Sequence, residues 1–325
     1  MNHSLSSLSR RSVVIGLSAL PLIGHAQAYP SKPVTLVVGY APGGTTDIVA
    51  RMAAQSLSSA TGKTFIVENK GGGSTTIATG YVAKAPADGY TLLANEMTQT
   101  IVPSLFPKLS FDPIKDLAAV TVFAEAPYVL VVNSSVPAKN LRELVELAKA
   151  QPGKLNFASG GAGSGPHIAG ELLKAVAGIE MTHVAYKGSG PAVQDLLGGQ
   201  VEVLITAAPT VAAQLASGRM RPLAVAHTKR LASLPNVPTA AEAGFPEFRI
   251  ANWFGIAAPK GTPPDVIAYL HAEVQKMIKR PDVREKLLAA GAETVSMTPA
   301  EASRHIETEA RRWGELIHKA GIKVD

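Results

Sequence analysis

The stretch that most constrains the fold is a glycine-bearing turn between an apolar run and a helical pattern. Residues 34–38 are apolar and mostly β-branched, which favours a strand. Residues 39–47 form the turn, and apolar residues at helical spacing follow. Gly43 and Gly44 have no Cβ, so the backbone can take unusual dihedral angles and let a ligand approach closely. The order strand, glycine turn and helix predicts an α/β fold.

The first residues of this helix predict an anion site. We expect Thr45 or Thr46 to be the N-cap, with Asp47 in the first turn, where the helix dipole favours a carboxylate. The remaining free N–H groups of a helix start can hold an anion. Because the turn carries hydroxyls and no cation, a carboxylate suits it better than a polyphosphate.

A second unit of the same kind occurs about 120 residues later. Residues 155–158 predict a strand, residues 159–165 a glycine-rich loop, and Pro166 the first residue of a helix. Two such units suggest two α/β lobes, with the ligand between them at the carboxyl ends of the strands.

Other segments complete the expected architecture. Residues 128–132 predict a buried strand whose natural partner is the apolar run 248–258, and residues 209–216 predict a helix. The pattern at residues 298–301 is a capping box that begins a C-terminal helix. Strands and helices alternate as in a parallel sheet covered by helices.

The first 28 residues predict a secretory signal peptide. Two arginines precede an apolar run at residues 13–23, and Ala-Gln-Ala at residues 26–28 predicts cleavage after Ala28. Both general and twin-arginine export remain open. The chain has no cysteine to carry a lipid anchor, so we expect a freely diffusing periplasmic protein. Its positive charge forms no run, which argues against nucleic acid as a partner.

Enzyme and metal chemistry have weaker signals. Ser164 does not fit the nucleophile elbow of hydrolases, and no histidine or acid can be assigned beside Ser159 or Ser164. A secreted serine hydrolase using one of them is the alternative class. His167 and Glu171 share a helix face, but a third metal ligand is missing, so we expect no metal and no cofactor. His183 stands alone in a strand and is expected to be structural.

Motifs along the mature chain resemble one family. The chain is similar to the extracytoplasmic receptors of tripartite tricarboxylate transporters, the Bug-type substrate-binding proteins. The motifs that carry the resemblance include Ala-Pro-Gly-Gly at 41–44 with Thr46-Asp47, Val-Glu-Asn at 67–69, Asp-Gly-Tyr-Thr-Leu-Leu at 88–93, Asn-Phe-Ala-Ser at 156–159, Tyr-Lys-Gly at 186–188, Leu-Leu-Gly-Gly-Gln-Val at 196–201 and Trp-Phe-Gly at 253–255.

The resemblance implies a two-lobed, monomeric type II periplasmic binding protein of the α/β class, with a ligand cleft between the lobes. Lobe 1 would comprise residues 29–126 and 251–325, and lobe 2 residues 127–250. Such a receptor would bind a di-, tri- or aromatic carboxylate and deliver it to integral-membrane transporter subunits. The alternative function is that of a ligand-binding partner of a two-component sensor. Such a partner would bind the same ligand but act in signalling rather than in transport.

The resemblance also implies the residues that contact the ligand. They are Tyr40, Gly44, Thr45, Thr46, Ser74, Thr76, Ser159, Gly161, Gly163, Ser164, His167, Tyr186 and Thr206. The chain departs from the family at two of them: Thr76 replaces the usual asparagine, and Thr206 replaces an aspartate found in many members. Asp47 is then the only carboxylate expected near the site. A buried ammonium would lack a partner, so we expect carboxylates without an amine.

Overall fold

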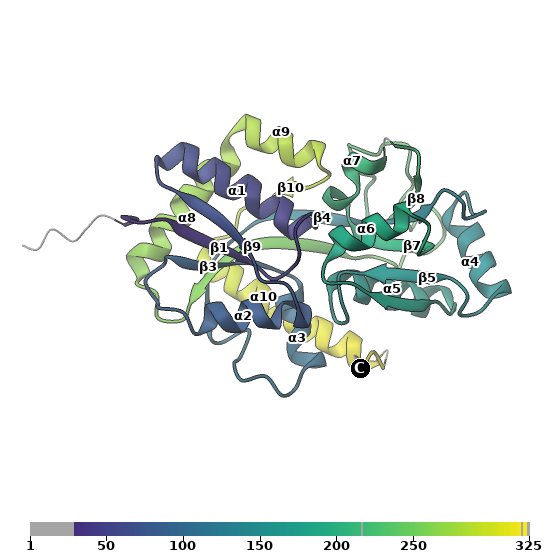
Figure 1. The fold of residues 1–325 in the computed structure, drawn as a ribbon, viewed down its shortest axis with the longest axis horizontal. Helices are drawn as coiled ribbons and strands as arrows, with labels where there is room; N and C mark the ends of the chain where they lie inside the picture. The colour runs from purple at the N-terminus through teal and green to yellow at the C-terminus, as the bar shows by residue number, and fades with distance from the viewer. Residues whose placement is uncertain (1–28, 216, 320, 324–325) are drawn as a thin grey trace, which may run out of the picture.

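The computed structural model describes residues 29–215, 217–319 and 321–323, and the predicted signal peptide lies outside them (Figure 1). The strands are β1 (Val34–Val38), β2 (Phe65–Asn69), β3 (Thr91–Glu96), β4 (Leu117–Asn133), β5 (Asn156–Ser159), β6 (Thr182–Ala185), β7 (Val203–Ala207), β8 (Met220–Val225), β9 (Ala251–Pro259) and β10 (Glu293–Thr294). The α-helices are α1 (Thr45–Thr61), α2 (Thr76–Ala83), α3 (Thr98–Leu105), α4 (Leu141–Ala150), α5 (Gly165–Ala177), α6 (Ser189–Leu197), α7 (Ala212–Leu215), α8 (Pro264–Lys279), α9 (Pro281–Ala289) and α10 (Pro299–Lys319). Two 3₁₀ turns, η1 (Gly73–Thr75) and η2 (Ala208–Thr210), complete the elements.

The strands form one continuous sheet in the order β2-β1-β3-β9-β4-β7-β5-β6, with β8 and β10 also paired to β4. Parallel pairs β1–β2 and β1–β3 lie at one end, and parallel pairs β5–β6 and β5–β7 at the other. The central strands β9 and β4 run antiparallel to their neighbours. Each predicted strand–turn–helix unit therefore belongs to its own end of the sheet, and the α/β class is confirmed.

Strand β4 joins the two ends of the sheet. Its residues from Leu117 to Pro127 pair with β9, and those from Tyr128 to Asn133 pair with β7 and β8. The predicted strand at 128–132 was too short, because the apolar run that precedes it belongs to the same 17-residue strand. The apolar run 248–258 does pair with this strand, because β9 runs antiparallel to β4, but its partners are Leu117–Pro127 rather than residues 128–132. At the boundary, the Tyr128 N–H donates to the Ile250 carbonyl at 3.2 Å.

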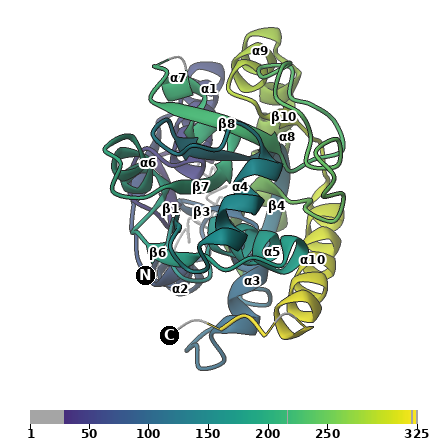
Figure 2. The ribbon, with the colours of Figure 1, turned by 90° about the vertical axis from the view of Figure 1, so that its right-hand side faces the viewer.

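Two further segments differ from expectation. The helix expected at 209–216 is divided into η2 and the short helix α7, which are separated at Val211. Helix α3 was not predicted, because Pro103 interrupts its pattern. It follows β3 directly and packs against α10, as both views of the ribbon show (Figures 1 and 2).

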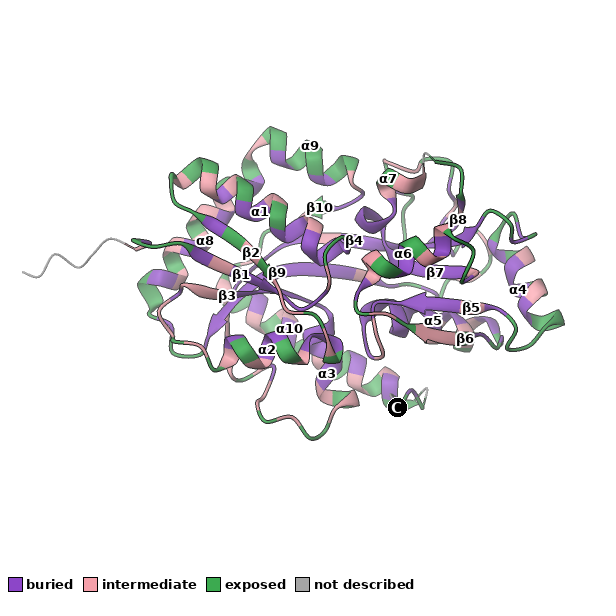
Figure 3. Cartoon of the chain, in the orientation of Figure 1, coloured by how far each residue is buried: buried purple, intermediate pink, exposed green. Residues whose placement is uncertain are grey.

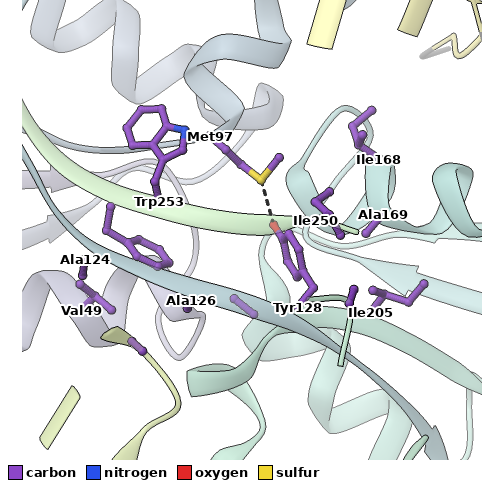
Figure 4. Packing of buried hydrophobic residues seen from close by; sticks show 14 of the residues in the cluster. Val49, Met97, Ala124, Ala126, Tyr128, Ile168, Ala169, Ile205, Ile250 and Trp253 are labelled. Carbon is purple, nitrogen blue, oxygen red and sulfur yellow. Dashed lines mark hydrogen bonds between the residues drawn. The ribbon is translucent and has the colours of Figure 1, made fainter. Parts of the chain in front are cut away.

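The core follows the sheet on both faces. Figure 3 shows buried residues along β4, β7 and β9, with exposed residues on the outer faces of the helices. The largest buried side chains include Tyr128, Phe157, Phe254 and Trp313. In Figure 4, Tyr128 lies among apolar residues from both ends of the sheet, and its hydroxyl contacts the Met97 sulfur at 3.4 Å. One apolar cluster thus includes residues from both sides of β4.

Candidate functional site

The first glycine turn positions the start of α1. Gly43 has a positive φ of 90°, and Gly44, in an extended conformation, is the N-cap. The expectation that Thr45 or Thr46 caps the helix was wrong: both lie inside the first turn and are buried. Glycine has no side chain that could accept from the first N–H groups, so these donors remain available to a ligand.

Asp47 serves the turn, as predicted. Its carboxylate accepts from the Gly43 N–H at 3.0 Å, pairs with Arg51 at 2.9 Å and accepts from the Asn69 amide at 2.9 Å. Burial alone would raise the pKa of Asp47. Hydrogen bonds from Arg51, Gly43 and Asn69 outweigh it and hold that pKa below its ordinary value. Asp47 is therefore ionised and committed to the protein.

A small cavity lies where the two ends of the sheet meet. Its lining comprises Tyr40, Gly44, Thr45, Thr46, Glu96, Tyr128, Pro166, Ser189, Thr206, Ala207 and Asn252. These residues include the starts of three helices, α1, α5 and α6. Among the described lining residues there is no lysine, arginine or histidine. Helix N-termini supply the positive potential instead.

Two of these helix starts lack a side-chain cap. Gly44 precedes α1 and Gly188 precedes α6, and neither offers a side-chain acceptor. The start of α5 differs, because Ser164 caps it by accepting from the His167 N–H at 3.4 Å. The free donors of α1 and α6 thus meet at the cavity, and both can donate to one anion.

Glu96 is the lining residue that sequence reasoning missed. It ends β3, its side chain is almost completely buried, and its Oε1 accepts from the Tyr40 hydroxyl and the Thr98 N–H, each at 3.1 Å. The expectation that Asp47 is the only nearby carboxylate was therefore wrong. Burial raises the pKa of Glu96, and hydrogen bonds from Thr98, Tyr40 and Asn252 oppose that rise only in part. An acid at the carboxyl end of a parallel strand was the signal that could have identified it.

Five predicted residues line the cavity: Tyr40, Gly44, Thr45, Thr46 and Thr206. The other eight, which the cavity lining does not include, are Ser74, Thr76, Ser159, Gly161, Gly163, Ser164, His167 and Tyr186. Their direct contact with a ligand stays a prediction. Ser189, Ala207, Tyr128 and Asn252 join the lining from positions that the motifs did not indicate, and Pro166 joins it from the predicted start of the second helix.

Several of these remaining residues hold loops together. The Ser74 hydroxyl donates to the Ala162 carbonyl and so joins the loop before α2 to the loop before α5. The Thr76 hydroxyl donates to the Gly73 carbonyl at 2.6 Å. The Tyr186 hydroxyl donates to Asp195 at 2.7 Å. These contacts stabilise the loops that precede α2, α5 and α6.

His183 does not stand alone, contrary to expectation. Its Nε2 lies 2.6 Å from the Ser159 hydroxyl, and its ring stacks on His167 with 4.0 Å between centroids. Burial lowers the pKa of His167 to about 3 and that of His183 to about 4. Both rings are therefore neutral near pH 7.

The Ser159–His183 pair does not make a hydrolase site. Ser159 and Ser164 are fully buried, and neither belongs to the cavity lining. A triad also needs an acid that orients the histidine. Within the described residues, the hydrogen bond of the His183 side chain is to Ser159, and no carboxylate bonds to it. The group is best explained as support for the loop between β5 and α5.

Over residues 29–215, 217–319 and 321–323, no group of three potential ligands is placed to hold a metal ion. His167 and Glu171 lie 3.9 Å apart, and Glu171 also pairs with Lys174 at 3.0 Å. No helix in the described part of the chain is long and apolar enough to span a bilayer.

The chain is similar to known proteins in sequence and in structure. Residues 49–322 match the model of the tripartite tricarboxylate transporter family receptor. Protein BugT of Bordetella pertussis is 37% identical over 324 residues, which cover 98% of this chain and 99% of BugT. The structure of Rpa4515 of R. palustris with adipate is 38% identical, covers 91% of this chain and 99% of that one, and has a TM-score of 0.88. MatC of Rhodopseudomonas palustris with bound malate is 33% identical, covers 89% of this chain and 100% of that one, and has a TM-score of 0.85.

Proposed function

Because this chain belongs to the tripartite tricarboxylate transporter receptor family, a family of binding proteins rather than enzymes, we propose that it captures a small carboxylate in the periplasm. It then delivers this ligand to the integral-membrane subunits of a transporter. The observation that carries the proposal is the meeting of two helix starts without side-chain caps, α1 and α6, at one cavity.

The chemistry of the cavity supports an anionic ligand of modest size. Free N–H groups at helix starts bind carboxylates without a cationic side chain, and hydroxyls of Thr45, Thr46 and Thr206 line the same space. Adipate and malate, bound by the two structural relatives, are both dicarboxylates. A di- or tricarboxylate, or an aromatic carboxylate, is the ligand class that we propose.

We further propose that lobe 1 (residues 29–126 and 251–325) and lobe 2 (residues 127–250) close on this ligand. The chain crosses between the two ends of the sheet near Ala126 and near Ile250. Contacts across the cavity support closure. The Ala41 N–H donates to the Lys187 carbonyl at 2.9 Å, and the Thr45 hydroxyl donates to the Ala207 carbonyl at 3.3 Å. As a monomer with its leader removed after Ala28, the receptor would present the closed form to the membrane.

A thermal-shift screen tests the proposal. The mature protein would be heated with adipate, malate, citrate, an aromatic dicarboxylate, hexanoate and neutral sugars. A ligand that binds only the folded state stabilises it by about 2.7 kcal/mol at a hundred times its Kd, which raises the melting temperature by several degrees. We expect such a shift with at least one carboxylate and none with the sugars. A shift confined to neutral compounds would contradict a carboxylate receptor.

A further inference from the structure

The carboxyl group of Glu96 faces the cavity without a cationic partner. It is 4% exposed and lines the cavity, and its Oε1 accepts from the Tyr40 hydroxyl and the Thr98 N–H. These donors are neutral, and so are the Thr98 hydroxyl and the Asn252 amide that also hydrogen-bond to the carboxyl group. Ordinarily a buried carboxylate has a positive partner or gives up its charge. Oε2, which takes no part in the bonds from the Tyr40 hydroxyl and the Thr98 N–H, is the oxygen through which Glu96 can meet a ligand.

The side chains around Glu96 come from several elements and carry no positive charge. Tyr40 follows β1 and Tyr128 lies in β4, and burial, followed by the proximity of Glu96, raises the pKa of both phenols, so both are neutral. Asn252 of β9 is an amide, and its Oδ1 accepts from the Met97 N–H at 3.1 Å. Asp47 of α1 is engaged with Gly43, Arg51 and Asn69. From these elements no cation offsets a charge on Glu96.

Charge balance then limits what the cavity can hold. The helix starts of α1 and α6 suit one carboxylate of the ligand. If the ligand carries a second carboxylate, an ionised Glu96 beside it would repel it in a dry space, because like charges at close range cannot both stay ionised. A protonated Glu96 would instead donate its O–H to that carboxylate, which is a strong, charge-assisted hydrogen bond.

We propose that Glu96 binds as a neutral carboxylic acid whose Oε2–H donates to the second carboxylate of a dicarboxylate ligand, which makes it a specificity-determining residue. This inference rests on the proposed carboxylate function and names its substrate class. The proton comes from solvent, and no covalent bond changes. Burial of Glu96, which raises its pKa, supports the same protonation state.

The sign of the pH dependence distinguishes this role from its opposite. If Glu96 must be protonated, affinity stays constant or falls as the pH rises, by up to about tenfold per pH unit above the pKa of Glu96 in the free protein. If Glu96 must be ionised to pair with a ligand ammonium, affinity rises with pH over the same range. The dicarboxylates themselves are fully ionised above about pH 6, so measurements from pH 6 to 9 report on the protein.

The experiment is calorimetry with adipate and hexanoate, which share a six-carbon chain and differ by one carboxylate. We expect the wild type to prefer adipate at pH 6 by at least about tenfold. Glu96→Gln keeps an N–H donor at this position, so it should retain that preference within about threefold and show no pH dependence. Glu96→Leu removes the donor and should lose at least about tenfold of the preference. Glu125→Gln, an acid of β4 outside the cavity, is the matched control and should behave like the wild type.

Three outcomes would overturn the role of Glu96 alone: equal losses in the Gln and Leu variants, an unchanged preference in the Leu variant, or an affinity that rises with pH. Binding of hexanoate or another monocarboxylate without any dicarboxylate would also leave the proposed function intact and reject this inference. Failure of every carboxylate would reject both. Circular dichroism and melting curves confirm that each variant is folded. The pH profile of the wild type shows whether affinity falls or rises with pH, and this measurement needs no variant.

Discussion

The threonines at the start of α1 are placed to act on ligand affinity. Thr46 is buried and lines the cavity beside the free N–H groups of the helix. If its hydroxyl donates to the ligand carboxylate, Thr46→Ala should cost about 1.5–3 kcal/mol, or about one to two orders of magnitude in Kd. Titration calorimetry with the carboxylate found in the screen measures this loss. An unchanged Kd would place the ligand away from α1.

The same titration on Ser159→Ala tests the predicted contact between the second glycine-rich loop and the ligand. Ser159 bonds to His183 and to the Gly161 backbone, so its removal should lower the melting temperature whether or not the ligand reaches it. A loss of affinity that exceeds the loss of stability would support direct contact. A loss of stability alone would assign Ser159 to the loop.

The two stacked histidines should make stability depend on pH. The pKa of His167 is lowered to about 3 and that of His183 to about 4, whereas an unfolded histidine has a pKa of about 6.5. Between these values the unfolded chain binds more protons. Stability is therefore fully present above about pH 6.5 and falls as the pH drops toward 4, by up to about 1.4 kcal/mol per pH unit for each ring.

Urea unfolding at pH 7, 6 and 5 measures this slope in the wild type and in His183→Gln. Carboxylates contribute alike to both proteins, so their effect cancels in the comparison. The variant should be less stable at pH 7 and show a shallower loss on acidification, because it has one fewer titrating ring. Parallel curves would show that His183 keeps an ordinary pKa.

At the scale of the elements, the capping box of α10 is confirmed. The Thr298 hydroxyl accepts from the Glu301 N–H at 3.3 Å, and the Glu301 carboxylate accepts from the Thr298 N–H at 2.8 Å. Thr298→Ala should therefore lower the free energy of unfolding by about 1 kcal/mol. Chemical denaturation measures it, and Thr308→Ala in the exposed middle of α10 is the control, where alanine should be neutral or stabilising. A cost at Thr308 as large as that at Thr298 would mean that the cap is not the cause.

The elements also show what the sequence could and could not predict. The strand–turn–helix units at Gly43 and Pro166 were predictable because glycine, proline and apolar periodicity act locally. The length of β4 and its change of partner depend on β7, β8 and β9, which are distant in sequence. Glu96 was missed although its place at the carboxyl end of a parallel strand was a usable signal, because its burial beside Tyr40 and Asn252 depends on strands that are distant in sequence.

At the scale of the whole molecule, closure should depend on a close approach between the first glycine turn and α6. A Cβ at Gly190 would clash with the Pro42 carbonyl oxygen, whereas the backbone of Gly190 itself is ordinary. Gly190→Ala should thus fold normally and oppose the closed form. We expect ligand to reduce the radius of gyration of the wild type in small-angle scattering, and to reduce that of Gly190→Ala less, with weaker binding.

Gly198→Ala is the matched control, at the other end of α6. A Cβ there would meet its nearest neighbour, the Gln194 carbonyl oxygen, at 3.4 Å, an ordinary contact distance. The control should bind and compact like the wild type. Equal scattering profiles with and without ligand, in the wild type at saturation, would instead indicate a preformed, rigid site.

Strand β4 pairs first with β9 and then with β7 and β8, and this change of partner strand affects the order in which the chain can fold. The first end of the sheet needs β9, which ends at Pro259, and its helical cover needs α8 and α10. A ribosome must therefore synthesise most of the chain before residues 29–126 can complete their part of the sheet and its helical cover. Contacts so distant in sequence form slowly, because the loop between them must close first. A nascent chain whose first half cannot fold early stays unfolded for longer. An unfolded polypeptide is the form that can pass through a narrow translocation channel.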